Sequence, residues 1–196
     1  MIATSMARVD AQPASGWLKR YYYLRFAFSA VWVGIAVAVA RDIPLLAAIM
    51  LVAYPAWDAI ANVVDARRSG GLARNRAQLL NFVVSTLTAV AVAIALGSGM
   101  NKVLLVFGIW AGLSGIFQLA TGIGRWKSVG AQWAMILSGA QSALAAVFMI
   151  QRAQGPDPAG IASVAPYAAF GAFYFAVSAV WLTISDVRKN RVAAAN

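Results

Sequence analysis

The sequence predicts an all-α integral membrane protein, with six transmembrane helices arranged as three repeated helical hairpins and both termini in the cytoplasm. Three observations support this prediction. Of the 196 residues, 62% are hydrophobic and only 11% are charged, whereas soluble domains carry about 25% charged residues. The apolar residues form continuous blocks, which is typical of membrane spans. The basic residues gather in alternate polar segments between those blocks.

Each apolar block is about as long as a helix that crosses a membrane. A helix needs about 20 residues to cross about 30 Å of hydrocarbon, and a lone strand would leave its backbone groups unpaired there. The six blocks cover residues 22–40, 44–64, 79–96, 103–123, 131–150 and 164–185. Segments rich in Gly and Pro, which interrupt helices, separate several of them, at 69–71, 97–99 and 155–160.

These boundaries divide the chain into one membrane domain and two tails. We expect the membrane domain at residues 21–187, with hairpins at about 21–66, 77–125 and 131–187. Residues 1–20 are expected to be a disordered cytoplasmic tail, and residues 188–196 a basic cytoplasmic tail.

The distribution of Lys and Arg predicts the orientation. Twelve of the sixteen lie in the two tails and in the second and fourth loops, whereas the other loops carry only Arg41, Lys102 and Arg152. The positive-inside rule places the richer segments in the cytoplasm. We therefore expect a multi-pass membrane protein with both termini in the cytoplasm. The small-x-small run 38–40 resembles a signal-peptide cleavage site, but cleavage would leave five spans and upset the charge alternation, so we expect the first span to be retained.

The composition excludes several classes of function. The chain has no Cys, no His and no Glu, so disulfides and thiol or imidazole catalysis cannot be built from it. The usual metal ligands reduce to six Asp, and we expect no metal, no cofactor and no enzymatic activity. The net charge of +10 lies in short segments between spans, which argues against a nucleic-acid partner. Expected partners are membrane lipids, a second copy of the chain or another membrane protein.

The spans also repeat in pairs. Three odd-numbered spans place a serine at the same position, and two sets of polar residues align in the even-numbered spans, which indicates parallel repeats. The aligned positions are Ser29, Ser85 and Ser138 in the odd spans, then Asp58, Ser114 and Tyr174, and Asn62, Gln118 and Ser178 in the even spans. Gly108-x-x-x-Gly112 adds a motif for close helix packing.

Asp58 lies inside the second block, where a formal charge costs roughly 2.5–3.5 kcal/mol. Arg25 lies 17 residues before the first turn, near residue 42, and Asp58 lies 16 residues after it, so a hairpin places both at similar depth. We therefore expect an Arg25–Asp58 ion pair. Tyr54 and Asn62 share the helix face of Asp58, and Pro55 weakens the helix and frees a carbonyl. The pair is either a structural clamp or part of a proton or cation site. The remaining alternative is an isolated Asp58 near the headgroups.

Two stretches carry a resemblance to a known family. They are WAGLSGIFQLATGIGRWK, from Trp110 to Lys127, and WAMILSGAQSALAAVFMI, from Trp133 to Ile150. This pattern resembles the HdeD-like bacterial acid-resistance membrane proteins, a short-repeat family of unknown function. Its parts are, in order, a Trp, the run from Gly115 to Gln118, a basic loop and a span with Ser138-Gly139. The resemblance covers about residues 82–181 and is weaker in the first hairpin. Pro residues that often end odd spans in that family are displaced here.

The resemblance implies a six-span, multi-pass protein of the bacterial inner membrane that is linked to stress or acid tolerance, and it supplies no catalytic residues. We therefore expect a non-enzymatic membrane protein that supports stress or acid tolerance of the envelope. The alternative is a small transporter or channel for protons or small solutes, with a polar path around Asp58.

Overall fold

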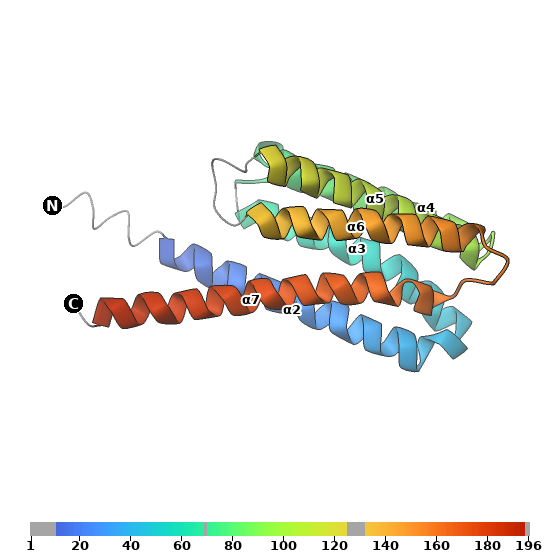
Figure 1. Cartoon of the computed structure of the whole chain (residues 1–196), viewed down its shortest axis with the longest axis horizontal. Helices are drawn as coiled ribbons and strands as arrows, with labels where there is room; N and C mark the ends of the chain where they lie inside the picture. Colours follow the sequence, from blue (N-terminus) through green and yellow to red (C-terminus); the bar gives the residue numbers. More distant parts are fainter. Residues whose placement is uncertain (1–10, 69, 125–131, 195–196) are drawn as a thin grey trace. The chain divides into compact units, whose positions relative to one another are not determined.

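The computed structural model describes residues 11–68, 70–124 and 132–194, and its long elements are six α-helices (Figure 1). The helices are α2 (Ala11–Ala38), α3 (Pro44–Arg68), α4 (Arg76–Leu96), α5 (Met100–Gly124), α6 (Gln132–Gln154) and α7 (Ala165–Ala194). Three short 3₁₀ helices lie in the connections, η1 (Ala40–Asp42), η2 (Leu72–Arg74) and η3 (Ile161–Ser163). The described residues contain no strand, and the predicted all-α fold is confirmed.

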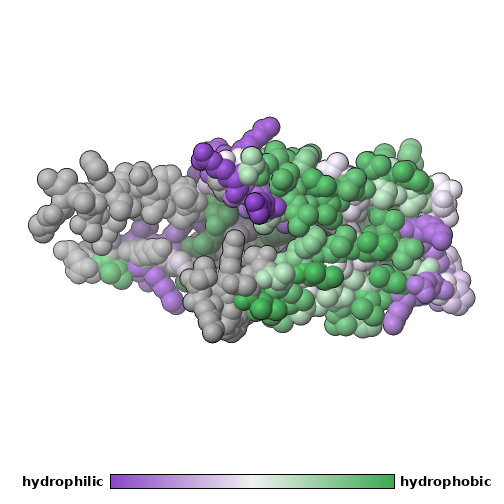
Figure 2. Space-filling model, turned by 90° about the horizontal axis from the view of Figure 1, so that it is seen from above, coloured by the Kyte–Doolittle hydropathy of each residue, from purple (hydrophilic) through white to green (hydrophobic). Residues whose placement is uncertain are grey.

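Five helices are long and apolar enough to cross a membrane. These stretches are Gly16–Ala38, Pro44–Arg68, Arg76–Leu96, Met100–Ala120 and Ala165–Val192. Large apolar side chains on them face outward, for example Leu87 and Ile94 of α4, which are 64% and 71% exposed. Figure 2 shows hydrophobic residues over much of the visible face, with hydrophilic residues gathered in separate patches. Soluble monomers rarely expose apolar surface on this scale, so the chain is a membrane protein.

The remaining helix, α6, occupies the place of the fifth expected span, 131–150. It runs for 23 residues from Gln132 to Gln154. Its described part is not among the five stretches that meet the length and hydropathy of a span.

Two helices are longer than the apolar blocks predict. α2 begins at Ala11, so residues 11–20, which we expected in a disordered tail, are helical, while residues 1–10 lie outside the described part of the chain. α7 continues to Ala194 and takes up most of the expected basic tail. The apolar pattern marks only the part of a helix that meets lipid, and it misses turns that polar contacts stabilise.

The chain forms two compact units, which we describe separately. The first contains most of α2 and of α7, and the second contains residues 32–167, from the end of α2 to the start of α7.

In the first unit, polar contacts join the extended ends of α2 and α7. Lys19 Nζ donates to Asp186 Oδ2 at 2.9 Å, and the hydroxyl oxygens of Tyr23 and Thr183 are 3.2 Å apart. The residue numbers rise along one helix as they fall along the other, so the two helices are antiparallel. The contact of Lys19 with Asp186 lies in the turns of α2 and α7 beyond the apolar blocks and stabilises them.

In the second unit, α3 packs on α4 and α5 packs on α6, while α4 also contacts α5. The first two pairs are joined by the connections that the sequence analysis assigns to the cytoplasm. The glycines at the first of these connections allow a sharp reversal: Gly70 and Gly71 have φ of 94° and 89°, and the Gly71 amide donates to the Ala66 carbonyl at 2.7 Å. Such positive φ values favour glycine, which has no Cβ to clash.

Glycines also set the distance between α5 and α6. A Cβ on Gly115 would lie 2.7 Å from the backbone nitrogen of Ala143 and from the carbonyl oxygen of Gly139. A Cβ on Gly108 would lie 2.9 Å from the Ile150 side chain, whereas one on Gly112 would make an ordinary 3.4 Å contact with Ala146. The predicted Gly108-x-x-x-Gly112 motif therefore lies in a helix contact, and Gly115 extends it by a further turn.

Candidate functional site

Asp58 lies on α3 within a group of hydrogen-bonded side chains from three helices. Its Oδ2 accepts hydrogen bonds from the hydroxyl of Ser85 on α4, at 2.8 Å, and from Nδ2 of Asn62, at 3.1 Å. Nε1 of Trp110 on α5 donates to the Ser85 hydroxyl oxygen at 3.2 Å. We call Asp58, Asn62, Ser85 and Trp110 the carboxylate cluster.

The carboxylate cluster links α3, α4 and α5 through a single hydroxyl. Ser85 accepts from Trp110 and donates to Asp58, so each bond polarises the other. The side chains of Ser85 and Trp110 are almost fully buried, with 1% and 5% exposure. Hydrogen bonds to an ionised group contribute about 1.5–3 kcal/mol each, which is enough to offset much of the cost of placing a carboxylate in a span.

The position of Asn62 follows from the helix period. It lies one turn after Asp58, and its Nδ2 also donates to the Asp58 carbonyl oxygen at 2.8 Å. The contact agrees with the shared helix face that the four-residue spacing predicts.

Tyr54, one turn before Asp58, belongs to a buried group of aromatic rings. Its ring centroid lies 4.8 Å from that of Trp32 and 6.0 Å from that of Trp110. Trp110 also meets Phe107 and Tyr167 edge to face, at 5.8 and 5.9 Å. These rings pack around Trp110, which is 5% exposed, and a low local dielectric strengthens its hydrogen bond to Ser85.

Pro55 lies inside α3, as expected, and cannot donate to the carbonyl of Leu51, four residues earlier. The indole of Trp32 donates to the adjacent carbonyl, that of Met50, at 2.9 Å. This contact is to a different carbonyl from the one that Pro55 frees, so it does not test the expectation from the proline.

Arg25 belongs to the first unit. Its Nη1 donates to the Tyr21 hydroxyl at 3.1 Å, and its guanidinium carbon lies 4.2 Å from the ring centroid of Phe175. A cation over an aromatic face gains about 0.5–2 kcal/mol. Because Arg25 and Asp58 belong to different units, the Arg25–Asp58 ion pair stays a prediction.

The other repeat positions are spread over the helices. Ser29 on α2 is buried, at 3% exposure. The half-buried positions are Ser114, Gln118, Ser138, Tyr174 and Ser178. Gln118 lies at the contact of α5 with α6, and its Oε1 is buried with no hydrogen-bond partner among the described residues. Of the aligned positions, the structure brings Asp58, Asn62 and Ser85 into one cluster.

Two residues that make polar side-chain contacts were not predicted as site residues. The first is Trp110, which sequence reasoning used only for the family resemblance. Its signal was an indole N–H in the middle of an apolar block, where a donor needs a partner. The second is Asn101, at the start of α5.

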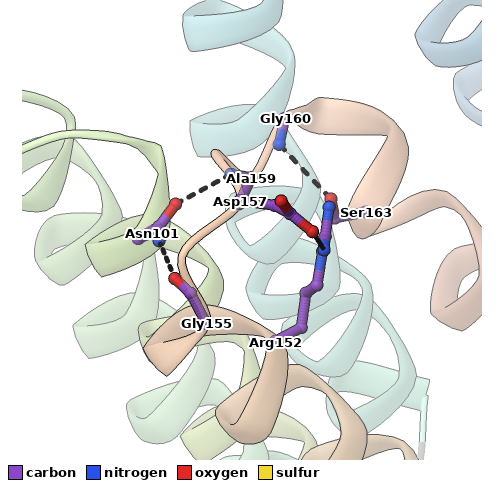
Figure 3. A network of polar contacts seen from close by, with 7 residues as sticks. All are labelled: Asn101, Arg152, Gly155, Asp157, Ala159, Gly160 and Ser163. Atoms are coloured by element: carbon purple, nitrogen blue, oxygen red, sulfur yellow. Dashed lines mark hydrogen bonds and ion pairs between the residues drawn. The ribbon is translucent and has the colours of Figure 1, made fainter.

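Asn101 fixes the connection between α6 and α7 (Figure 3). Its Oδ1 accepts from the amide of Ala159 at 2.7 Å, and its Nδ2 donates to the carbonyl of Gly155 at 3.5 Å. Nearby, Arg152 Nη1 donates to Asp157 Oδ2 at 2.9 Å across an exposed pair. The side-chain amide thus bridges two backbone groups of a loop that has no regular ladder to satisfy them.

The described residues hold no group of three or more His, Cys, Asp or Glu side chains placed to bind a metal ion. The carboxylate cluster offers one acid, one hydroxyl, one amide and one indole. The hydroxyl, the amide and the indole of this set can hold the carboxylate in place by hydrogen bonds.

Comparisons with models of protein families, with curated proteins and with solved structures gave no match. The fold and the membrane character therefore rest on the helices themselves, and the resemblance to HdeD-like proteins stays a prediction.

Proposed function

We propose that this chain is a non-enzymatic, multi-pass protein of the bacterial inner membrane that supports tolerance of envelope stress such as acid. The observation that best supports the proposal is the pair of hydrogen bonds that the Asp58 carboxylate accepts. Its Oδ2 accepts from two side chains, and one of these donors, Ser85, is in turn held by Trp110. An acid bonded in this way serves as a clamp between helices.

The resemblance to HdeD-like proteins supports the stress role. The stretches that carry it include Gly115 on α5 and Gly139 on α6, which meet at backbone distance. The residues that carry the resemblance thus pack two spans together, and none of them is a reactive group. A protein built around packing and clamping suits a structural role in the membrane.

Acid survival of a bacterial host that lacks the gene would test the proposal. We expect the wild-type chain and the Asp42→Asn variant to restore survival equally. Asp42 is a matched control because it is an exposed acid paired with Arg41 in a turn, at 3.2 Å. The Asp58→Asn variant should restore survival only in proportion to the folded protein found in the membrane. A deletion strain that survives acid as well as its parent would contradict the stress role.

Proton flux into proteoliposomes separates this function from the transport alternative. A structural protein should give the same flux as protein-free vesicles under a pH gradient. Flux that depends on the wild-type chain and disappears in a folded Asp58→Asn variant would favour a proton path through Asp58 over the structural role.

A further inference from the structure

The connection between α3 and α4 carries a dense group of positive charge. Four arginines lie within ten residues, and all four are exposed: Arg67, Arg68, Arg74 and Arg76. We call them the arginine group. One acid lies nearby, Asp65 in the last turns of α3, and its Oδ2 accepts a hydrogen bond from Gln78 at 3.1 Å.

The backbone of this connection holds the arginines close to the start of α4. The reversal at Gly70 and Gly71 leads directly into η2, which ends at Arg74, and α4 begins at Arg76. Arg74 lies back over the reversal, since a Cβ on Gly70 would be 3.4 Å from its Cδ. Arg74 and Arg76 therefore lie on either side of Asn75, the N-cap of α4, in the chain.

The first turn of α4 adds to the positive potential. It contains no acidic residue, and Asn75 at its N-cap makes no side-chain cap. The side-chain Nδ2 of Asn75 donates to the Gly71 carbonyl, at 2.9 Å. The helix dipole and the first backbone N–H groups of α4 thus act in the same direction as the arginines.

The position of the arginine group along the helices indicates the partner. Leu79, Leu80 and Val83 follow within two turns and are 39%, 40% and 42% exposed. Positive charge that directly adjoins an exposed apolar surface lies at the level of lipid headgroups. A guanidinium also matches a phosphate oxygen pair in a bidentate geometry.

Two basic residues near other helix ends are paired with acids. Arg41 pairs with its neighbour Asp42 at 3.2 Å, and Arg152 pairs with Asp157 at 2.9 Å. These acids lower the local positive potential, so an anionic lipid gains less there. The difference supplies a matched control for the arginine group.

We propose that the arginine group, with the first turn of α4, is a binding site for the phosphate headgroup of an anionic phospholipid in the adjoining leaflet. Arg74 and Arg76 provide the main contacts, and Arg67 adds charge from the end of α3. The site is independent of the function proposed above.

Native mass spectrometry of the full chain in a neutral detergent tests the site directly. Short-chain phosphatidylglycerol is titrated into the protein, and phosphatidylcholine serves as the zwitterionic reference. Each basic residue near an anionic surface contributes about 1 kcal/mol, so the Arg74→Gln/Arg76→Gln variant should bind phosphatidylglycerol roughly 30-fold more weakly. The Arg41→Gln/Arg152→Gln variant, which changes the net charge equally, should bind within about twofold of wild type.

Three results would overturn the proposal. The first is an equal loss of binding in both double variants, which would mean that only net charge matters. The second is no loss in either variant. The third is competition by inorganic phosphate as effective as that of the lipid, which would indicate a site for soluble anions. If the Arg74→Gln/Arg76→Gln variant does not fold, Arg67→Gln replaces it, with an expected loss of about fivefold.

Discussion

The hydroxyl of Ser85 donates a 2.8 Å hydrogen bond to the carboxylate of Asp58 and thereby joins α4 to α3 within the span. Ser85→Ala removes this donor from a buried position, and we expect it to lower the free energy of unfolding by about 1.5–3 kcal/mol. Thr86→Ala is the matched control, because Thr86 is exposed and its hydroxyl donates only to the Phe82 carbonyl of its own helix. Unfolding in mixed micelles, followed by circular dichroism, measures both. Equal losses in the two variants would contradict a special role for Ser85.

The predicted Arg25–Asp58 ion pair has a double-mutant test. Arg25→Gln and Asp58→Asn should each reduce the folded yield, because each leaves one charge in the span without its opposite. The double variant should recover much of that loss, with a coupling of about 0.5–3 kcal/mol in unfolding experiments. Additive losses would show that the two residues act separately and that Ser85 and Asn62 account for the stability of Asp58.

Trp110→Phe removes the indole N–H and keeps an aromatic ring, so it measures the effect of the hydrogen bond separately from that of packing. The variant keeps most of the packing against Tyr54 and Phe107 but deletes the donor to Ser85. We expect a loss of about 0.5–1.5 kcal/mol in the free energy of unfolding. Trp181→Phe should change the stability far less, since Trp181 is 67% exposed. A loss at Trp110 no larger than at Trp181 would mean that the hydrogen bond contributes little.

Gly115→Ala should disturb the contact of α5 with α6. The new Cβ would lie 2.7 Å from two backbone atoms, which cannot move as a flexible side chain can. We expect a loss of about 1–3 kcal/mol. Gly34→Ala is the control, because a Cβ there meets nothing within 4 Å, and the substitution removes a glycine from a helix interior. Its stability should be unchanged or higher, and a comparable loss at both positions would rule out close packing as the cause.

Asn101→Ala should loosen the connection between α6 and α7. The amide of Ala159 loses its acceptor, so its hydrogen exchange should become faster, while amides in the middle of α5 should exchange as before. Asp157→Asn breaks only the exposed pair with Arg152, which is worth about 0–1 kcal/mol, and should leave the Ala159 amide protected. Unchanged exchange in Asn101→Ala would show that the loop is held by other contacts.

Much of the architecture could be predicted because the lipid bilayer requires apolar helices of about a fixed length. The lengths of the apolar blocks and the Gly and Pro residues between them place four of the spans, those of α3, α4, α5 and α6, within four residues of the observed helices at both ends. The ends of α2 and α7 could not be predicted in this way, because Lys19 and Asp186 stabilise turns that are polar in sequence. Such a contact depends on which helices are neighbours, and hydropathy carries no information on neighbours.

The carboxylate cluster was predicted in part. The sequence predicts Asp58, Asn62 and Ser85 as candidates and predicts, from equal depths within one hairpin, a pair of Asp58 with Arg25 that stays a prediction. Comparing depths in the same way across the connection between α3 and α4 places Asp58 and Ser85 at similar depth. Asp58 lies ten residues before the end of α3 at Arg68, and Ser85 lies nine residues after the start of α4 at Arg76. Which residues of equal depth meet depends on the rotation of each helix about its own axis. A span that is hydrophobic on all sides has no apolar face from which that rotation can be predicted.

The pairing of α2 with α7 has a consequence for biosynthesis. The ribosome makes α2 first and α7 last, so Lys19 and Tyr23 enter the membrane long before Asp186 and Thr183 exist. While the intervening spans are inserted, the polar side chains of the leading helix have to be sheltered by water, headgroups or the insertion machinery. Release from the translocon before α7 is complete would leave that helix without its final neighbour, and quality-control proteases could recognise the unfinished chain by this exposed segment.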